Sequence, residues 1–158
     1  MRRYVRREFP LFHHVILPYT KGMSDKTIFE KIIDRDIPST IVYEDEESIA
    51  FMDIMPVTKG HLLFVSKKPY ESIQDVPDEL LGSMFSKAKK LIVAMKEALG
   101  CDYVQVAIAG DEVPHFHIHL IPRHRGAKIF GEHRPEATYA EGEKQMFAEK
   151  ITQALTRE

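Results

Sequence analysis

Residues 115–121 read His-Phe-His-Ile-His-Leu-Ile, so three histidines alternate with large apolar side chains. Successive side chains of a β-strand point to opposite faces of a sheet, so this alternation predicts a strand over 115–121. One face carries the imidazoles, and the other carries apolar side chains that suit a core. At about 3.3 Å per residue, the first and third histidines lie roughly 13 Å apart. One small ligand therefore meets His117 and one neighbour.

This row of histidines suits attack on a phosphate group. A neutral imidazole is a nucleophile, and a second imidazole can donate to the developing charge. From the residues alone, partly buried structural histidines and a zinc-binding β protein stay open as alternatives. The first and third histidines are too far apart to share one ion easily, and no second strand supplies an evident cysteine or carboxylate partner. We therefore expect no metal and no cofactor.

The flanking sequence predicts an α+β fold with a five-stranded, mostly antiparallel sheet and flanking helices. Ser24 and Asp25 are helix-capping types ahead of a short apolar helical stripe over 28–33, which Pro38 ends. β-prone runs predict a meander over 40–43, 48–53 and 61–66 and further strands over 103–108 and 115–121. A long helix is expected between Pro77 and Gly100, and another over 141–155.

Composition bounds the class of protein. The 158 residues suit one domain, and the single cysteine excludes an internal disulfide and is typical of a reducing, cytoplasmic setting. A net charge of -2 does not favour a nucleic-acid partner, and no apolar run is long enough to span a membrane. Residues 1–22 carry five basic residues and one acidic residue. We interpret 1–22 as a basic extension, with a targeting segment as the alternative, and 23–158 as the domain.

The histidine row, with Pro122-Arg123 after it, resembles the signature of the histidine triad (HIT) superfamily of nucleotide hydrolases and transferases. The resemblance covers about 25–123 and is closest to the histidine triad nucleotide-binding branch. It rests also on the order and spacing of Thr27 to Ile33, Ile37-Pro38, Tyr43-Glu44-Asp45, Ala50 to Pro56 and His61. It implies a HIT-like fold and a homodimer.

The resemblance also implies the site. His117 is the nucleophile that becomes nucleotidylated at the α-phosphate of a purine nucleotide, such as an AMP derivative, and His119 assists the leaving group. His115 and His61 order the imidazoles. Nucleotide binding falls to Ile28, Phe29, Ile32, Phe51 and Ile54 around the base, Asp53 at the ribose, and Gly110 and Val113. The implied activity is that of a phosphoramidase, hydrolase or nucleotidyl transferase, with a nucleotide-binding protein of little turnover as the alternative.

Three departures from the family pattern bear on this interpretation. Thr27 and Glu30 stand where zinc-binding members have cysteines, so a structural zinc is not expected. Asp111 and Glu112 stand where the nucleotide-binding branch has Gln-Ser, and carboxylates beside a phosphate repel it. The segment after Arg123 does not resemble that branch, so the sequence assigns it no role.

Overall fold

The computed structural model describes residues 26–110, 112–126 and 137–157. Their elements follow in the order α1 (Ile28–Ile33), β1 (Ile41–Glu44), β2 (Ser48–Met52), β3 (Leu62–Ser66), a 3-10 turn (Ile73–Asp75), α2 (Asp78–Leu99), β4 (Tyr103–Ala107), β5 (His117–Arg123) and α3 (Glu143–Leu155). The expected extension at 1–22, the boundary at residue 23 and the caps at Ser24 and Asp25 lie outside the described residues.

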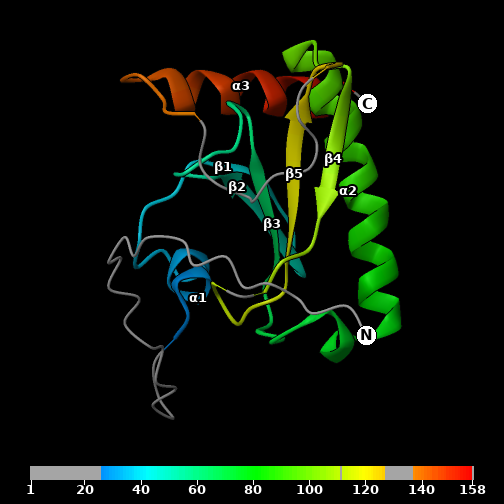
Figure 1. Cartoon of the computed structure of the whole chain (residues 1–158). Helices are drawn as coiled ribbons and strands as arrows, with labels where there is room; N and C mark the ends of the chain where they lie inside the picture. The colour runs from blue at the N-terminus through cyan, green and yellow to red at the C-terminus, as the bar shows by residue number, and fades with distance from the viewer. Residues whose placement is uncertain (1–25, 111, 127–136, 158) are drawn as a thin grey trace, which may run out of the picture.

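The five strands form one antiparallel sheet in the order β1-β2-β3-β5-β4. The first three strands are the expected meander, and β5 enters between β3 and β4 (Figure 1). The α+β, HIT-like fold is therefore confirmed. Because β5 is hydrogen-bonded to β3 on one side and to β4 on the other, the histidine row lies in the interior of the sheet.

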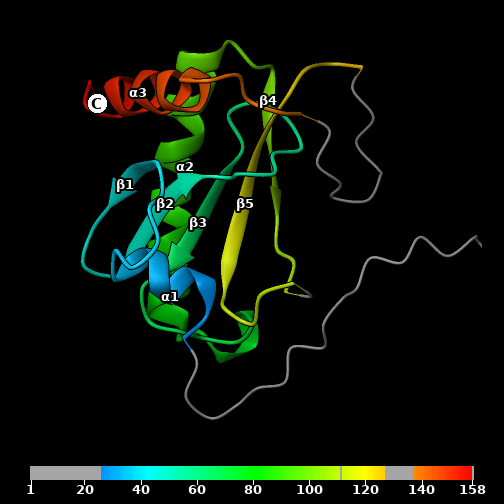
Figure 2. The same ribbon diagram turned by 90° about the vertical axis from the view of Figure 1, so that its left-hand side faces the viewer.

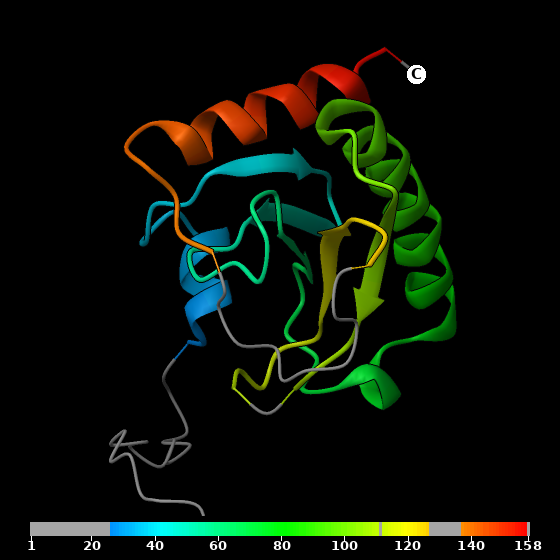
Figure 3. The ribbon, with the colours of Figure 1, turned by 45° about the horizontal axis from the view of Figure 1, so that its top comes forward.

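The sheet has two differently covered faces. On one face, α2 and α3 close a core with Ala50, Phe64, Ile118 and Leu120. Figures 1 and 2 show α2 along this side, and Figure 3 shows α3 crossing the end of α2 beside β1. On the other face, α1 packs onto a smaller apolar cluster of β2 and β3 side chains. The histidines of β5 share this second face.

The starts of the first helix and of the last strand show where the structure differs from the sequence-based expectation. The first helix is capped by Thr27, whose hydroxyl accepts from the Glu30 amide at 3.2 Å while the Glu30 carboxylate accepts from the Thr27 amide at 2.8 Å. This reciprocal pair is a capping box, so the residue that caps the helix is Thr27 and not Ser24 or Asp25. The last strand begins at His117, because the preceding amides turn aside: His115 donates to the Val113 carbonyl and Phe116 to the Tyr70 carbonyl.

The long helix was predicted well, since α2 ends where Gly100 adopts the left-handed conformation at φ 63°. The C-terminal helix begins at Glu143, two residues later than expected. None of the helices in the described ranges is long and apolar enough to cross a membrane.

Asp45 ties the β1–β2 turn to α2. Its carboxylate accepts from the Tyr43 hydroxyl at 2.6 Å, the Ser48 amide at 2.7 Å and the Glu47 amide at 2.9 Å, and Lys87 lies 2.7 Å away. Burial by itself would raise the pKa of Asp45, but these donors outweigh it and hold that pKa well below its usual range.

We expect Asp45 to make folding stability depend on pH. A carboxyl group whose pKa is lower in the folded than in the unfolded state stabilises the fold at pH values above its unfolded-state pKa of about 4. This contribution is lost as the pH falls below that pKa toward the folded-state pKa. Asp45→Asn therefore lowers the urea midpoint at pH 7, and its difference from the parent narrows toward pH 3. Glu46→Gln, which changes an exposed neighbour, is the matched control. A difference that is the same at both pH values contradicts this role of Asp45.

Candidate active site

Two imidazoles of the row meet on the α1 side of the sheet. The ring centroids of His117 and His119 lie 4.8 Å apart, and the Phe29 ring of α1 meets His117 edge-on at 5.0 Å. His119 is partly exposed and His117 is 6% exposed, whereas His115 is fully buried. The neighbour that can share a ligand with His117 is therefore His119.

The orientation of the His117 ring is fixed by the backbone two residues before it. Its Nδ1 lies 2.7 Å from the His115 carbonyl oxygen. A carbonyl only accepts, so Nδ1 carries the proton and Nε2 carries the lone pair. This is the tautomer that a nucleophilic imidazole needs, and it is set before any substrate arrives.

His115 acts as an internal support below that carbonyl. Its Nε2 donates to the Ser66 carbonyl at 2.7 Å, and its Nδ1 accepts from the Thr27 hydroxyl at 3.0 Å. Burial lowers the pKa of His115, and the two partners already suit the neutral ring. The ordering role that the resemblance implies for His115 thus has a physical basis, because Thr27 joins the start of α1 to the residue that aims His117.

We expect Thr27→Val to destabilise the protein by about 2–3 kcal/mol, because it removes a helix cap and leaves a buried acceptor on His115 unsatisfied. Thermal unfolding measures the loss, and nitrogen NMR of His115 reports the loss of the fixed Nε2–H tautomer. Thr27→Ser keeps the hydroxyl and serves as the control. Equal stability of the two variants contradicts the support that we assign to Thr27.

Asp53, His61 and His119 form a second chain of side chains. The Asp53 carboxylate lies 3.1 Å from His61 Nδ1, and His61 Nε2 lies 3.0 Å from His119 Nδ1. The Val57 amide also approaches His61 Nδ1, at 3.3 Å. The carboxylate is closer and only accepts, so Nδ1 carries the proton. His61 Nε2 then accepts from His119, which leaves His119 Nε2 as the atom that serves a ligand.

The series of contacts from Asp53 through His61 to His119 shows that one expectation was wrong, namely that no carboxylate outside the histidine strand would lie near the histidines. Asp53 and His61, which flank the β2–β3 connection, do approach His119, and ligand atoms of the three lie within 4.8 Å of one another. They are the described residues best placed to hold a metal ion. However, the two ring nitrogens of His61 point in opposite directions, one toward each partner, so a single ion cannot replace both contacts. The expectation of no metal stays a prediction.

The proposed nucleotide-binding residues divide into a buried set and an exposed set. We call the buried Phe29, Ile32 and Phe51 the floor, and the exposed Ile28 and Ile54 the rim. Phe29, Ile32 and Phe51 are 5%, 8% and 3% exposed and pack with Ile49, Leu63 and Val65, with Val113 against them. Ile28 and Ile54 are 45% and 70% exposed, so they are the apolar side chains of this set that a ligand touches first. Gly110 has open space beside it. Glu112 is exposed, and Asp111 lies outside the described residues.

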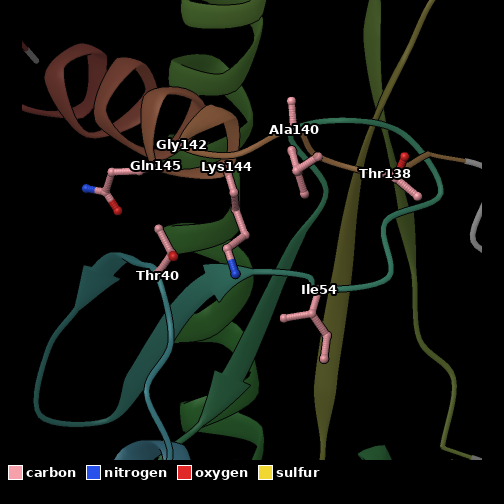
Figure 4. Close-up of a pocket in the computed structure, with 8 residues that line it drawn as sticks. Thr40, Ile54, Thr138, Ala140, Gly142, Lys144 and Gln145 are labelled. Atoms are coloured by element: carbon pink, nitrogen blue, oxygen red, sulfur yellow. The ribbon is translucent and has the colours of Figure 1, made fainter.

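The C-terminal segment, to which the sequence assigned no role, approaches this rim. It contributes to an open pocket of about 440 Å³ lined by Thr40, Ile54, Thr138, Tyr139, Ala140, Gly142, Lys144 and Gln145. Figure 4 shows the Lys144 side chain pointing from α3 toward Thr40 and Ile54. The Tyr139 hydroxyl accepts from the Gly60 amide at 2.9 Å, next to His61. Of the residues predicted for the site, only Ile54 lines this pocket.

Sequence comparison agrees with this geometry. The HIT domain pattern matches residues 34–126, and the chain therefore belongs to the HIT domain family. The histidine triad resemblance is thus confirmed, and the chain falls among nucleotide-binding and hydrolase-type proteins.

Individual relatives are similar over most of the domain. An uncharacterized HIT-like protein of Methanocaldococcus jannaschii is 44% identical over 63% of this chain and 80% of its own. An adenosine 5'-monophosphoramidase of Saccharomyces cerevisiae is 41% identical over 72% and 76%. Among solved structures, a Hit-like protein of Bartonella henselae superimposes with TM-score 0.73 at 34% identity, covering 83% of this chain and 97% of that one. A zinc-bound histidine triad family protein of Mycobacterium smegmatis gives TM-score 0.70 at 28% identity, covering 82% and 93%.

Proposed function

We propose that this protein hydrolyses a purine nucleotide derivative at its α-phosphate through a nucleotidyl-histidine intermediate on His117. The observation that carries the proposal is the fixed tautomer of His117, whose Nδ1–H bond to the His115 carbonyl leaves the Nε2 lone pair for attack. The relative from Saccharomyces cerevisiae that acts as an adenosine 5'-monophosphoramidase supports this choice of substrate class.

The reaction has two balanced steps. In the first, the Nε2 lone pair of His117 forms a bond to the α-phosphorus, and the bond from phosphorus to the leaving nitrogen or oxygen breaks. The leaving atom keeps that electron pair and takes a proton from protonated His119. In the second, water attacks the phosphorus, the electron pair of the P–N bond returns to Nε2, and the proton of the water goes to His119. His117 and His119 end as they began.

The chain from Asp53 supports the proton transfer. The Nδ1–H of His119 donates to His61, and His61 donates to the Asp53 carboxylate. A carboxylate at the far end stabilises the positive charge on His119 before it gives up its proton. The resemblance assigns Asp53 to the ribose hydroxyls, so we propose that this carboxylate serves both the ribose and His61.

The rim favours a purine. Ile28 and Ile54 expose apolar surface, and a flat purine buries more area against such side chains than a pyrimidine does. The leaving half of the substrate, which is an amine or a second nucleotide, then lies beyond His119.

The second candidate is a nucleotide-binding protein with little turnover, which the 6% exposure of His117 favours. AMP release from adenosine 5'-phosphoramidate, measured beside calorimetric binding of AMP, separates the two. We expect both binding and release, with release unchanged by a chelator because no step needs a metal. Binding without release supports the second candidate. If AMP neither binds nor is released, the protein has no nucleotide site of the proposed kind. Loss of activity in chelator that zinc restores points instead to a metal at Asp53, His61 and His119.

We further propose the homodimer that the resemblance implies. Strand β4 is an edge of the sheet, and Val106 on it and Ile108 just beyond it are 42% and 40% exposed. An unpaired edge with apolar side chains is a ready surface for a second copy. Light scattering tests this: the parent elutes as a dimer and Val106→Lys shifts toward monomer, whereas a monomeric parent contradicts the proposal.

A further inference from the structure

Arg123 is a buried cation with a neutral partner. It ends β5 on the face that carries His117 and His119, and it is 6% exposed. Its Nε donates to the Gln105 side-chain oxygen at 2.9 Å. Within the described residues, no carboxylate lies within ion-pair distance of it. Asp102, the nearest acidic residue along β4, instead accepts from the Arg125 amide and lies 3.7 Å from His124.

This contact with Gln105 satisfies only part of the hydrogen-bonding capacity of the Arg123 guanidinium. A buried charge without a counter-ion is costly, and one amide oxygen serves only one of the several N–H donors of an arginine. The described residues contain no fully buried side-chain nitrogen or oxygen without a partner, so the terminal nitrogens of Arg123 still reach solvent. The arrangement is therefore that of a cation held in a fixed place with donors left over.

The strand register places Arg123 relative to the histidines. Across the β4–β5 ladder, Arg123 faces Tyr103, whereas Gln105 faces Ile121 and Ala107 faces His119. The contact from Arg123 to Gln105 is thus diagonal across the ladder, and Gln105 stands opposite Ile121, midway between Arg123 and His119 along β5. The Cα atoms of Arg123 and His119, four residues apart on the strand, are about 13 Å apart, and the buried Ile121 lies between them on the same face.

We propose that Arg123, aimed by Gln105, forms an anion subsite for a phosphate group of the leaving half of the substrate, beyond the α-phosphate. The inference rests on the proposed function and selects one class of leaving group, a nucleotide or polyphosphate over a small amine. When the bond to the α-phosphorus breaks, the electron pair stays on an oxygen of the next phosphate. A planar guanidinium binds that growing charge through paired hydrogen bonds.

Two substrates with the same nucleotide half test the subsite. Adenosine 5'-phosphoramidate releases a neutral amine, and diadenosine triphosphate releases anionic ADP. We expect Arg123→Gln to lower kcat/KM for diadenosine triphosphate by about ten- to a hundredfold and to change the value for the phosphoramidate by less than about threefold. Arg125→Gln removes an exposed charge two residues on and leaves both values unchanged.

Gln105→Glu provides a second variant if Arg123→Gln folds poorly. It places a carboxylate on the Arg123 guanidinium, so it too lowers the kcat/KM for diadenosine triphosphate selectively while the thermal midpoint is kept. Equal losses on both substrates, no loss on either, or a parent that cleaves only the phosphoramidate each overturn the subsite and leave the proposed function standing. A parent that cleaves neither substrate overturns both.

Discussion

Replacing His117 by alanine is expected to reduce AMP release from adenosine 5'-phosphoramidate at least about a thousandfold, because it removes the imidazole that we propose forms the bond to phosphorus. AMP itself still binds within a few-fold of the parent affinity. The apolar floor is made by Phe29, Ile32 and Phe51, and none of these side chains is changed. Single-turnover release and calorimetric binding of AMP give the two numbers.

His124→Ala is the matched control for this experiment. The His124 side chain is 69% exposed and lies just beyond β5, 3.7 Å from Asp102. We expect the parent rate from this variant. Comparable rates from His117→Ala and the parent contradict the covalent mechanism, and loss of AMP binding by His117→Ala shows that the imidazole holds the ligand.

Gly60→Ala is expected to destabilise the protein by about 2–4 kcal/mol, which lowers the thermal midpoint by roughly 5–15 °C. Gly60 has φ +93°, a conformation that other residues adopt only with strain, and an added Cβ lies 2.5 Å from Leu99 Cδ1 and 3.2 Å from Pro122 Cγ. The backbone that moves to relieve this contact carries His61, so the variant also loses turnover.

Gly82→Ala separates this effect from a general response to added methyl groups. Gly82 lies on the exposed side of α2, with nothing within 4 Å of an added Cβ. Because glycine is a poor helix former, we expect a gain of about 0.5–1 kcal/mol. If Gly60→Ala is as stable as the parent, the close approach at Gly60 does not constrain the position of His61.

The sequence predicted the parts of this fold that depend on local spacing. The alternation in the histidine row gave the strand and its two faces, since Ile118 and Leu120 are buried in the core opposite His117 and His119. The start of the strand was missed because it depends on a distant group, the Tyr70 carbonyl that takes the Phe116 amide. No local pattern reports such a partner.

The site was predicted as a set of residues and not as an arrangement. The resemblance supplied Asp53, His61 and His119, but their order as a hydrogen-bonded chain follows from the register of β2, β3 and β5, which spacing along the chain does not contain. The diagonal contact between Arg123 and Gln105 has the same origin. Tyr139, more than seventy residues after Gly60, was missed because its segment matches no motif.

The stereochemical course at phosphorus tests the central claim most directly. The substrate is the phosphorothioate analogue of adenosine 5'-phosphoramidate with a single configuration at phosphorus, hydrolysed in heavy-oxygen water, and phosphorus NMR gives the configuration of the product. Attack by His117 and then by water inverts the centre twice, so this account predicts retention. Inversion means that water attacks the substrate directly, and it contradicts a nucleotidyl-histidine intermediate.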